Sequence, residues 1–160
     1  MTISVGEKIP SVSVMMATSN GPEKADTAEI LAGAKVALFS VPGAFTPTCS
    51  AQHLPGYVEH ADAFKAKGVE KIVCMSVNDA FVMGAWGEAH GASSKVHMLA
   101  DGNGDFARAL GLTMDGAAFG MGERSQRFSM VIENGEVAHL FIEEPGAFEV
   151  SSAEHMLSKL

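Results

Sequence analysis

Short apolar runs alternate with longer segments of mixed polarity along this chain, and the alternation predicts an α/β protein. Three apolar runs are typical of strands covered on both faces of a sheet: "KVALFSV", "EKIVCMSV" and "KVHMLAD". An earlier run, "SVSVMMA", alternates at first between polar and apolar positions and predicts a shorter strand. Each of the three apolar runs is followed by a segment with helical features, so strands and helices are expected to alternate as far as residue 111.

Helix boundaries are indicated by capping residues and glycines. Residues 49–67 are expected to be helical, to break or bend at Pro55-Gly56, and to stop at Gly68. Residues 78–91 and 104–111 each end in glycine, which predicts two further helices.

Two shorter helices are predicted near the ends of the chain. "TAEILAG" has Thr27 as its expected cap and Gly33 as its stop. The last segment, "SSAEHMLSKL", has Ser151 three residues before Glu154, which is the spacing of a capping box.

The second half of the chain departs from the strand–helix alternation. Residues 111–125 are rich in glycine and predict a loop, and two apolar runs then flank Asn134-Gly135, a strong hairpin signal. Parallel units therefore come first, and an antiparallel pair with a last helix follows. This order predicts one domain over residues 1–160, with a central mixed sheet and helices on both faces. It resembles a thioredoxin-like fold with an insertion between its halves.

Composition narrows the classes of partner. The chain has 160 residues, 47% of them hydrophobic, and a net charge of −8 with only three arginines, which argues against nucleic-acid binding. No apolar run approaches the roughly 20 residues that span a bilayer, and the first residues lack the pattern of a secretory signal. Two cysteines are too few for a disulfide framework. We therefore expect a cytoplasmic protein of a reducing compartment that binds neither nucleic acid nor membrane.

One of the two cysteines occupies an unusual place, at the end of the loop "SVPGAFTPTC" where a helix should begin. A thiol becomes a good nucleophile only when ionised, and unpaired N–H groups at a helix start favour the anion. The loop carries no charge, so a cation must come from elsewhere in the fold. Arg127 is the best placed, because it opens an apolar strand on the face opposite Phe128 and Met130; a merely polar strand end is the alternative.

The stretch "PGAFTPTC" matches the peroxiredoxin signature P-x-x-x-T-x-x-C, with Pro42, Thr46 and Cys49 in place. Four further stretches look like the type II, or atypical two-cysteine, subgroup: "VGEKIPSVSV", "HLPGYVE", "CMSVNDAFVMGAW" and "RSQRFSMVIENGEV". The chain is therefore similar to a peroxiredoxin over essentially its full length.

The resemblance implies a thiol-dependent peroxidase that reduces hydrogen peroxide and alkyl hydroperoxides. Cys49 would attack the peroxide and become a sulfenic acid, Thr46 would bridge thiolate and peroxide, and Arg127 would stabilise the developing charge. Pro42 would shield the pocket. No metal and no organic cofactor is implied. The substrate pocket is expected to include His53, Phe45 and Phe119, with a position on the helix surface as the alternative for His53.

The resemblance does not determine how the sulfenic acid on Cys49 is reduced back to the thiol. Cys74, within "KIVCMSV", is expected to be a buried strand residue. Either it resolves the sulfenic acid by forming a disulfide with Cys49, or it is structural and an external thiol does so, from glutathione with glutaredoxin or from thioredoxin. A homodimer is expected through Phe45, Phe81 and residues 114–121.

Other kinds of function find weaker support. A thioredoxin-type disulfide oxidoreductase needs a C-x-x-C pair, but Gln52 stands at the second cysteine position. A cysteine hydrolase could pair Cys49 with His53, yet no third member is evident, and a non-catalytic holdase would not need the thiol. A metal site is not expected, because the histidines are scattered, and "DGNGDFARALGL" lacks the sixth glycine and the last glutamate of a calcium loop.

Overall fold

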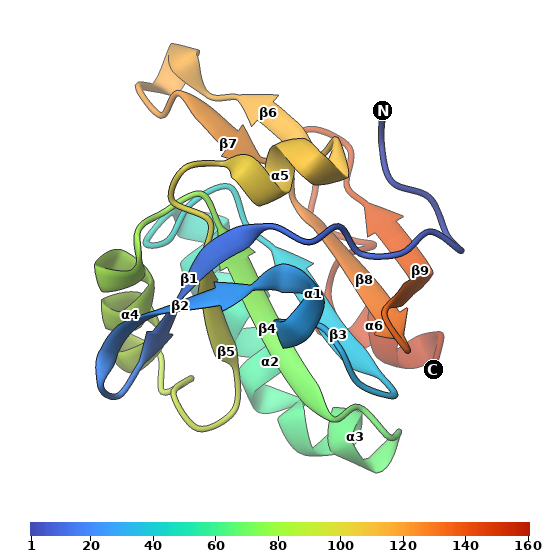
Figure 1. Cartoon of the computed structure of the whole chain (residues 1–160). Helices are drawn as coiled ribbons and strands as arrows, with labels where there is room; N and C mark the ends of the chain where they lie inside the picture. Colours follow the sequence, from blue (N-terminus) through green and yellow to red (C-terminus); the bar gives the residue numbers. More distant parts are fainter.

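Seven strands form one mixed sheet through the middle of the molecule (Figure 1). The computed structural model describes residues 1–160, and the strand order is β2-β1-β5-β4-β3-β8-β9. The central strands β3, β4 and β5 are parallel, and every other pair in the sheet is antiparallel. The strands of this sheet are β1 Ser13–Thr18, β2 Gly21–Asp26, β3 Val36–Ser40, β4 Lys71–Ser76, β5 His97–Ala100, β8 Phe128–Glu133 and β9 Glu136–Ile142.

Helices cover both faces of the sheet, which confirms the predicted fold class. One buried cluster includes side chains of α2, α3, α4 and α6, and the other includes side chains of α5 together with Leu31 and the N-terminal residues. None of the helices combines the length and apolar character that a membrane-spanning segment needs. The helices are α1 Thr27–Ile30, η1 Cys49–His53, α2 Leu54–Glu59, α3 Ala61–Ala66, α4 Ala80–Ala89, α5 Asp105–Leu110, η2 Ala117–Phe119 and α6 Ala153–Ser158.

The two-sided cover explains the unbroken apolar runs. In β3, Phe39 packs into one cluster and Leu38 into the other, because successive side chains of a strand point to opposite faces. In β8, Phe128 and Met130 face the α5 side, so Arg127, just before the strand, shares the opposite face with Val131. The Asn134-Gly135 hairpin forms as predicted, with φ of 53° and 80° at its two central residues.

Some elements differ from the prediction. Strand β2 was not predicted from the sequence; it is a polar strand at the edge of the sheet. The expected loop of residues 111–125 contains β6 Thr113–Asp115 and β7 Glu123–Ser125, which pair as a separate two-stranded sheet. Both strands are only three residues long, too short to show a period in the sequence.

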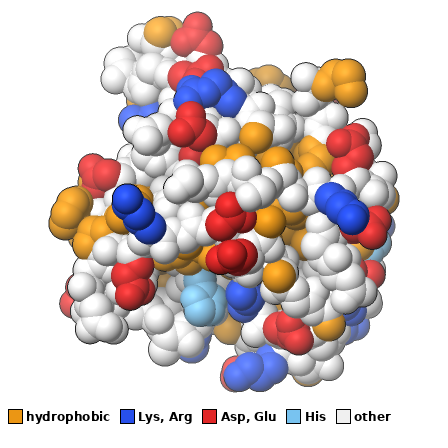
Figure 2. Space-filling model, in the orientation of Figure 1, with side chains coloured by type: hydrophobic (Ala, Val, Ile, Leu, Met, Phe, Trp, Pro, Cys, Tyr) orange, Lys and Arg blue, Asp and Glu red, His pale blue; other side chains and the backbone are white.

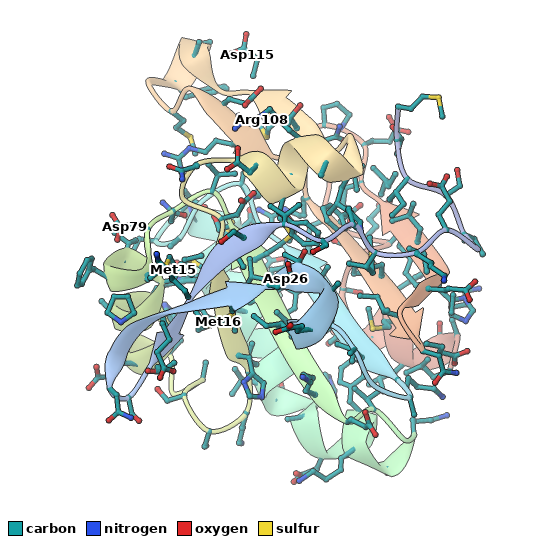
Figure 3. All side chains as sticks on the ribbon, viewed as in Figure 1. Met15, Met16, Asp26, Asp79, Arg108 and Asp115 are labelled. Carbon is teal, nitrogen blue, oxygen red and sulfur yellow. The ribbon has the colours of Figure 1, made fainter.

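Helix caps and breaks are shifted from the expected residues. Asp26 rather than Thr27 caps α1, because its carboxylate accepts from the Ala28 N–H at 2.8 Å (Figure 3 labels Asp26 at this turn). Ser152 rather than Ser151 caps α6. The helix after Cys49 does not stop at Pro55, just before which it changes from a π-helical turn to the α-helix α2, and it is interrupted at His60.

Candidate active site

The loop between β3 and the helix of Cys49 is held in an uncommon conformation. Phe45 has a φ of 64°, which costs a bulky residue about 1–3 kcal/mol. The loop is fixed on one side by a hydrogen bond of 2.9 Å from the Ala44 N–H to Asn78 Oδ1. On the other side, a Cβ added at Gly43 would lie 3.2 Å from both Met121 Cε and Arg124 Nη1, so the β6–β7 hairpin packs closely on it.

Cys49 lies in the first turn of the helix that this loop enters. Helical conformation begins at Pro47, and Cys49–His53 form a π-helical turn in which the Leu54 N–H donates to the Cys49 carbonyl. Pro55 follows directly, and its ring would clash with the carbonyl four residues back in a regular α-helix. The wider π turn relieves that clash, and such turns are frequent at functional sites.

Arg127 provides the cation at Cys49. Its Nη2 lies 3.0 Å from the Cys49 Sγ and donates to it, and the thiol is fully buried. Arg124 instead donates to the carbonyls of Met121 and Pro42, and Arg108 pairs with acidic side chains at the surface. Of the three arginines, only Arg127 donates to the Cys49 sulfur.

His53 lies behind Arg127 and not on the helix surface. Its Nδ1 is 2.8 Å from Arg127 Nη1 and its Nε2 is 3.0 Å from the Ser151 carbonyl. Since a guanidinium can only donate, Nδ1 must accept and Nε2 must carry the proton. Burial and the neighbouring Arg127 charge lower the pKa of His53 to about 3, so the imidazole is neutral. With both nitrogens engaged, His53 cannot act as a base for Cys49, which removes the basis for a cysteine hydrolase.

Thr46 is half-buried in the same loop, and its hydroxyl donates to the Gly43 carbonyl at 2.6 Å. The proton is therefore already used, and the hydroxyl oxygen has lone pairs left to accept a hydrogen bond.

A cavity of about 600 Å³ lies next to Arg127. Its walls include Pro42, Thr48, Phe119, Arg127 and Glu143. The structure thus places Pro42 and Phe119 at the cavity. Phe45 and His53 are not among its lining residues, since Phe45 is 56% exposed elsewhere on the loop and His53 is fully buried.

Comparison with known proteins identifies the family. Residues 4–157 match the Redoxin family model. Peroxiredoxin-2E-2, chloroplastic, of Oryza sativa subsp. japonica is 49% identical, over 99% of this chain and 73% of the relative. Peroxiredoxin-2B of Arabidopsis thaliana is 43% identical, over 99% of this chain and 98% of the relative. This chain belongs to the peroxiredoxin family.

The fold likeness is equally close. The crystal structure of reduced Prx3 in complex with H₂O₂ from Vibrio vulnificus has a TM-score of 0.94 and 52% identity, covering 99% of each chain. The peroxiredoxins are thiol-dependent peroxidases, and this chain is therefore an oxidoreductase of that class.

The second cysteine of this peroxiredoxin lies in the centre of the sheet. Cys74 is fully buried in β4, paired with Phe39 on one side and Met98 on the other, and both cysteines are free thiols in one buried cluster. Burial, followed by the nearby Cys49, raises the pKa of the Cys74 thiol well above its ordinary value. Cys74 is therefore a neutral thiol in its present position.

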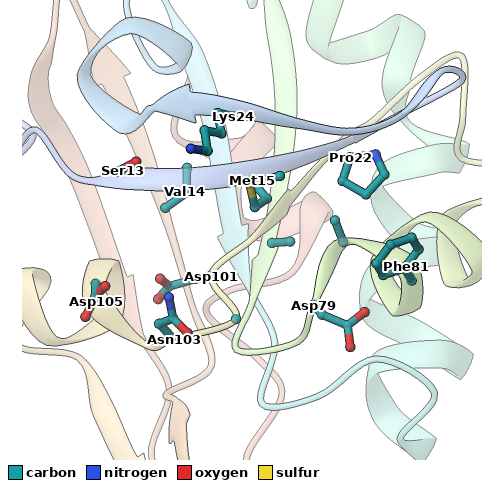
Figure 4. Close-up of a pocket in the computed structure, with 13 residues that line it drawn as sticks. Ser13, Val14, Met15, Pro22, Lys24, Asp79, Phe81, Asp101, Asn103 and Asp105 are labelled. Atoms are coloured by element: carbon teal, nitrogen blue, oxygen red, sulfur yellow. The ribbon is translucent and has the colours of Figure 1, made fainter.

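A separate cavity of about 380 Å³ lies between β1 and the start of α4 (Figure 4). Its lining includes Asp79, Phe81 and Asp101 and shares no residue with the cavity at Arg127. Asp101 is the first residue of the segment that resembles a calcium loop, but its two oxygens accept from the N–H groups of Phe106 and Ala107. No group of three or more His, Cys, Asp or Glu side chains is placed to hold a metal ion.

Proposed function

We propose that Cys49 is the peroxide-reducing cysteine of this enzyme and that Arg127 is its principal electrostatic partner. The observation that carries the proposal is the 3.0 Å contact between Arg127 Nη2 and the Cys49 Sγ in a buried site. The thiolate attacks one peroxide oxygen, so that an S–O bond forms as the O–O bond breaks. The departing oxygen takes a proton and leaves as water or alcohol, and Cys49 becomes a sulfenic acid.

The other residues of the loop support this attack. The Thr46 oxygen accepts a hydrogen bond from the peroxide O–H, because its own proton is held by Gly43. Pro42 offers no N–H to water and, with Phe119, narrows the cavity above Arg127. The positive guanidinium stabilises the charge that develops on the departing oxygen.

Hydrogen peroxide and small alkyl hydroperoxides are the proposed substrates. Cys49 is fully buried, so a substrate has to enter between Pro42, Thr48 and Arg127. A small, uncharged molecule meets this requirement best. The Vibrio vulnificus relative is described in complex with H₂O₂, which supports the same substrate here.

An external thiol is the proposed reductant of the sulfenic acid, supplied by glutathione with glutaredoxin or by thioredoxin. Cys74 is on a central strand with neighbours on both sides and has a raised pKa, so it is a poor attacking group where it stands. A reducing compartment such as the cytoplasm suits this cycle, because both cysteines are free thiols.

A homodimer is the proposed assembly. Phe45, Phe81 and Phe119 are 56%, 75% and 78% exposed. Phe45 lies in the loop before Cys49, and the segments just before Phe81 and just after Phe119 contact this loop, through the hydrogen bond from Ala44 to Asn78 and the close approach of Met121 to Gly43. Exposed apolar groups gathered in this way are typical of an interface.

The test is a stopped-flow measurement of the reduced protein mixed with hydrogen peroxide. Trp86, the single tryptophan, donates to the Ser50 hydroxyl at 3.0 Å and so reports on the residue next to Cys49. We expect a fluorescence change at a rate far above that of free cysteine, with matching loss of peroxide, and neither signal in Cys49→Ser. A rate no faster than free cysteine, or equal activity in Cys49→Ser, would overturn the proposal.

A further inference from the structure

Glu143 is a buried carboxylate beside the active site that the proposed reaction does not use. It follows β9 directly, is only 7% exposed, and its N–H donates to the Arg127 carbonyl at 3.1 Å. Glu143 and Arg127 thus face each other across the ladder of β8 and β9, with their side chains on the same face.

The carboxylate nevertheless binds the loop and not the arginine. One oxygen, Oε2, accepts from the Glu149 N–H at 2.7 Å, the Ser151 N–H at 2.8 Å and the Ser151 hydroxyl at 2.6 Å. Arg127 makes no ion pair; its two terminal nitrogens donate to Cys49 and His53. The loop donors therefore keep the carboxylate from competing for the guanidinium.

Ser151 connects this loop to the back of the active site. Its carbonyl accepts from His53 Nε2 at 3.0 Å and from the Tyr57 hydroxyl at 2.9 Å. The first of these bonds sets the tautomer in which His53 Nδ1 accepts from Arg127. Phe148, in the same loop, packs edge-on against His53 and lies 5.8 Å from the Arg127 guanidinium, measured to the ring centre.

We propose that Glu143 is a positioning residue for the peroxidase reaction: by fixing Ser151, it holds His53, and through His53 it aims the Arg127 guanidinium at Cys49. The inference rests on the roles proposed above for Cys49 and Arg127. Glu143 touches none of the reacting atoms and acts only through the chain of hydrogen bonds from Ser151 to His53 to Arg127.

The carboxylate is suited to this role over the working pH range. Burial alone would raise the pKa of Glu143, but the hydrogen bonds from Ser151 and Glu149 outweigh it and hold the pKa below its usual range. Glu143 is therefore ionised at neutral pH, where its negative charge is balanced by the donors of the loop.

The sign of the effect separates positioning from simple charge. If Glu143 acted only through its negative charge, removing that charge would favour the Cys49 thiolate and speed its reactions. If Glu143 positions Arg127, the same removal loosens the guanidinium and disfavours the thiolate. Glu143→Gln keeps the size and loses the charge, so the two interpretations predict opposite shifts.

The experiment measures alkylation of Cys49 by iodoacetamide in the reduced protein as a function of pH, together with peroxide reduction. For Glu143→Gln we expect the midpoint of the alkylation profile to move to higher pH and peroxide reduction to slow by roughly 10- to 100-fold. Glu149→Gln is the matched control, because its exposed side chain lies in the same loop, carries the same charge and makes no hydrogen bond or ion pair. It should leave both measurements unchanged.

Several outcomes would overturn the inference. These are a shift of Glu143→Gln to lower pH, an equal shift in Glu149→Gln, or a lower melting temperature with an unchanged alkylation profile. If Glu143→Gln does not fold, Ser151→Ala decides, since it removes one donor to the carboxylate and keeps the Ser151 carbonyl. A smaller shift in the same direction supports the inference, and no shift overturns it. Because alkylation needs no peroxide, the shift is measurable even if the proposed peroxidase activity fails.

Discussion

Three polar side chains of the site differ in charge and in hydrogen bonding. Arg127 provides the charge, His53 remains neutral with its pKa near 3, and the Thr46 oxygen keeps lone pairs that can accept a hydrogen bond. His53 therefore adds no titration of its own near neutral pH. Its contribution is the direction in which it holds one nitrogen of Arg127 while the other meets Cys49.

Replacing Arg127 should slow peroxide reduction by an amount that measures its contribution to the reaction. Loss of one charge-assisted contact in a buried site is worth roughly 2–4 kcal/mol, so Arg127→Ala should slow peroxide reduction by about 30- to 1,000-fold. Arg127→Lys should recover only part of this loss, since one ammonium cannot reproduce the planar fork that meets both Cys49 and His53. The measurement is the stopped-flow rate of the reduced protein with hydrogen peroxide.

Arg108→Ala is the control for this prediction, because it removes the same charge from a surface pair with Asp105 and Glu123. Wild-type activity in Arg127→Ala would contradict the proposal that Arg127 is the electrostatic partner of Cys49. Arg124, the other arginine next to the loop before Cys49, would then be the candidate.

The residues proposed to contact the peroxide have a signal in the sequence, whereas the residues proposed to position them have none. The motif of "PGAFTPTC" gave Pro42, Thr46 and Cys49, and strand parity gave Arg127 its face. Ser151 and Glu143 had no such signal, since Glu143 ends an apolar run and Ser151 fits a capping pattern. Their proposed roles rest on contacts between β9, the last loop and η1, which are far apart in the sequence.

At the scale of elements, the central strands and most helices could be predicted from the sequence. Unbroken apolar runs indicate strands covered on both faces, and glycines mark the ends of helices, and both features are local. Strand β2 was missed because its residues are mostly polar, and the β6–β7 hairpin was missed because each strand has only three residues. Both are defined by their pairing with a neighbouring strand. The π turn of η1 was missed because it depends on Pro55 one turn later, while the sequence indicated only a break.

The placement of the two cysteines in different elements leads to a prediction about Cys74. Cys49 lies in η1 and Cys74 in β4, where strand neighbours on both sides hold its backbone, and a disulfide requires Cα atoms within about 7 Å of each other. We expect Cys74→Ala to keep the fast first reduction and full turnover with a glutathione and glutaredoxin system. Alanine is the better replacement here, because a serine hydroxyl would be buried without a partner.

Mass spectrometry after one equivalent of peroxide provides the check. With glutathione present, wild type and Cys74→Ala should both carry glutathione on Cys49. Formation of an internal disulfide in the wild type, together with loss of turnover in Cys74→Ala, would instead make Cys74 the resolving cysteine.

At the scale of the whole molecule, the reactive loop is where distant segments meet. Charged side chains of both signs are interspersed over the face shown in Figure 2, as expected for a solvent-exposed surface. Around the catalytic loop the chain instead exposes Phe45, Phe81 and Phe119. The loop is also held by Asn78 on one side and the β6–β7 hairpin on the other, so an interface here would further fix the strained conformation of Phe45.

The last prediction concerns assembly through this surface. Phe81 lies one residue into α4, where an aspartate suits the helix start, so Phe81→Asp should fold normally. In a symmetric dimer each such change counts twice, and burial of a phenylalanine is worth about 1.5–3 kcal/mol, so the dimer should weaken roughly 100- to 10,000-fold. Light scattering and sedimentation at micromolar concentration should give a dimer for the reduced wild type and a monomer for Phe81→Asp.

Val5→Asp is the control, since Val5 is 61% exposed in the N-terminal segment and its replacement should leave the dimer intact. A monomeric wild type, or equal dissociation in Val5→Asp, would contradict this interface.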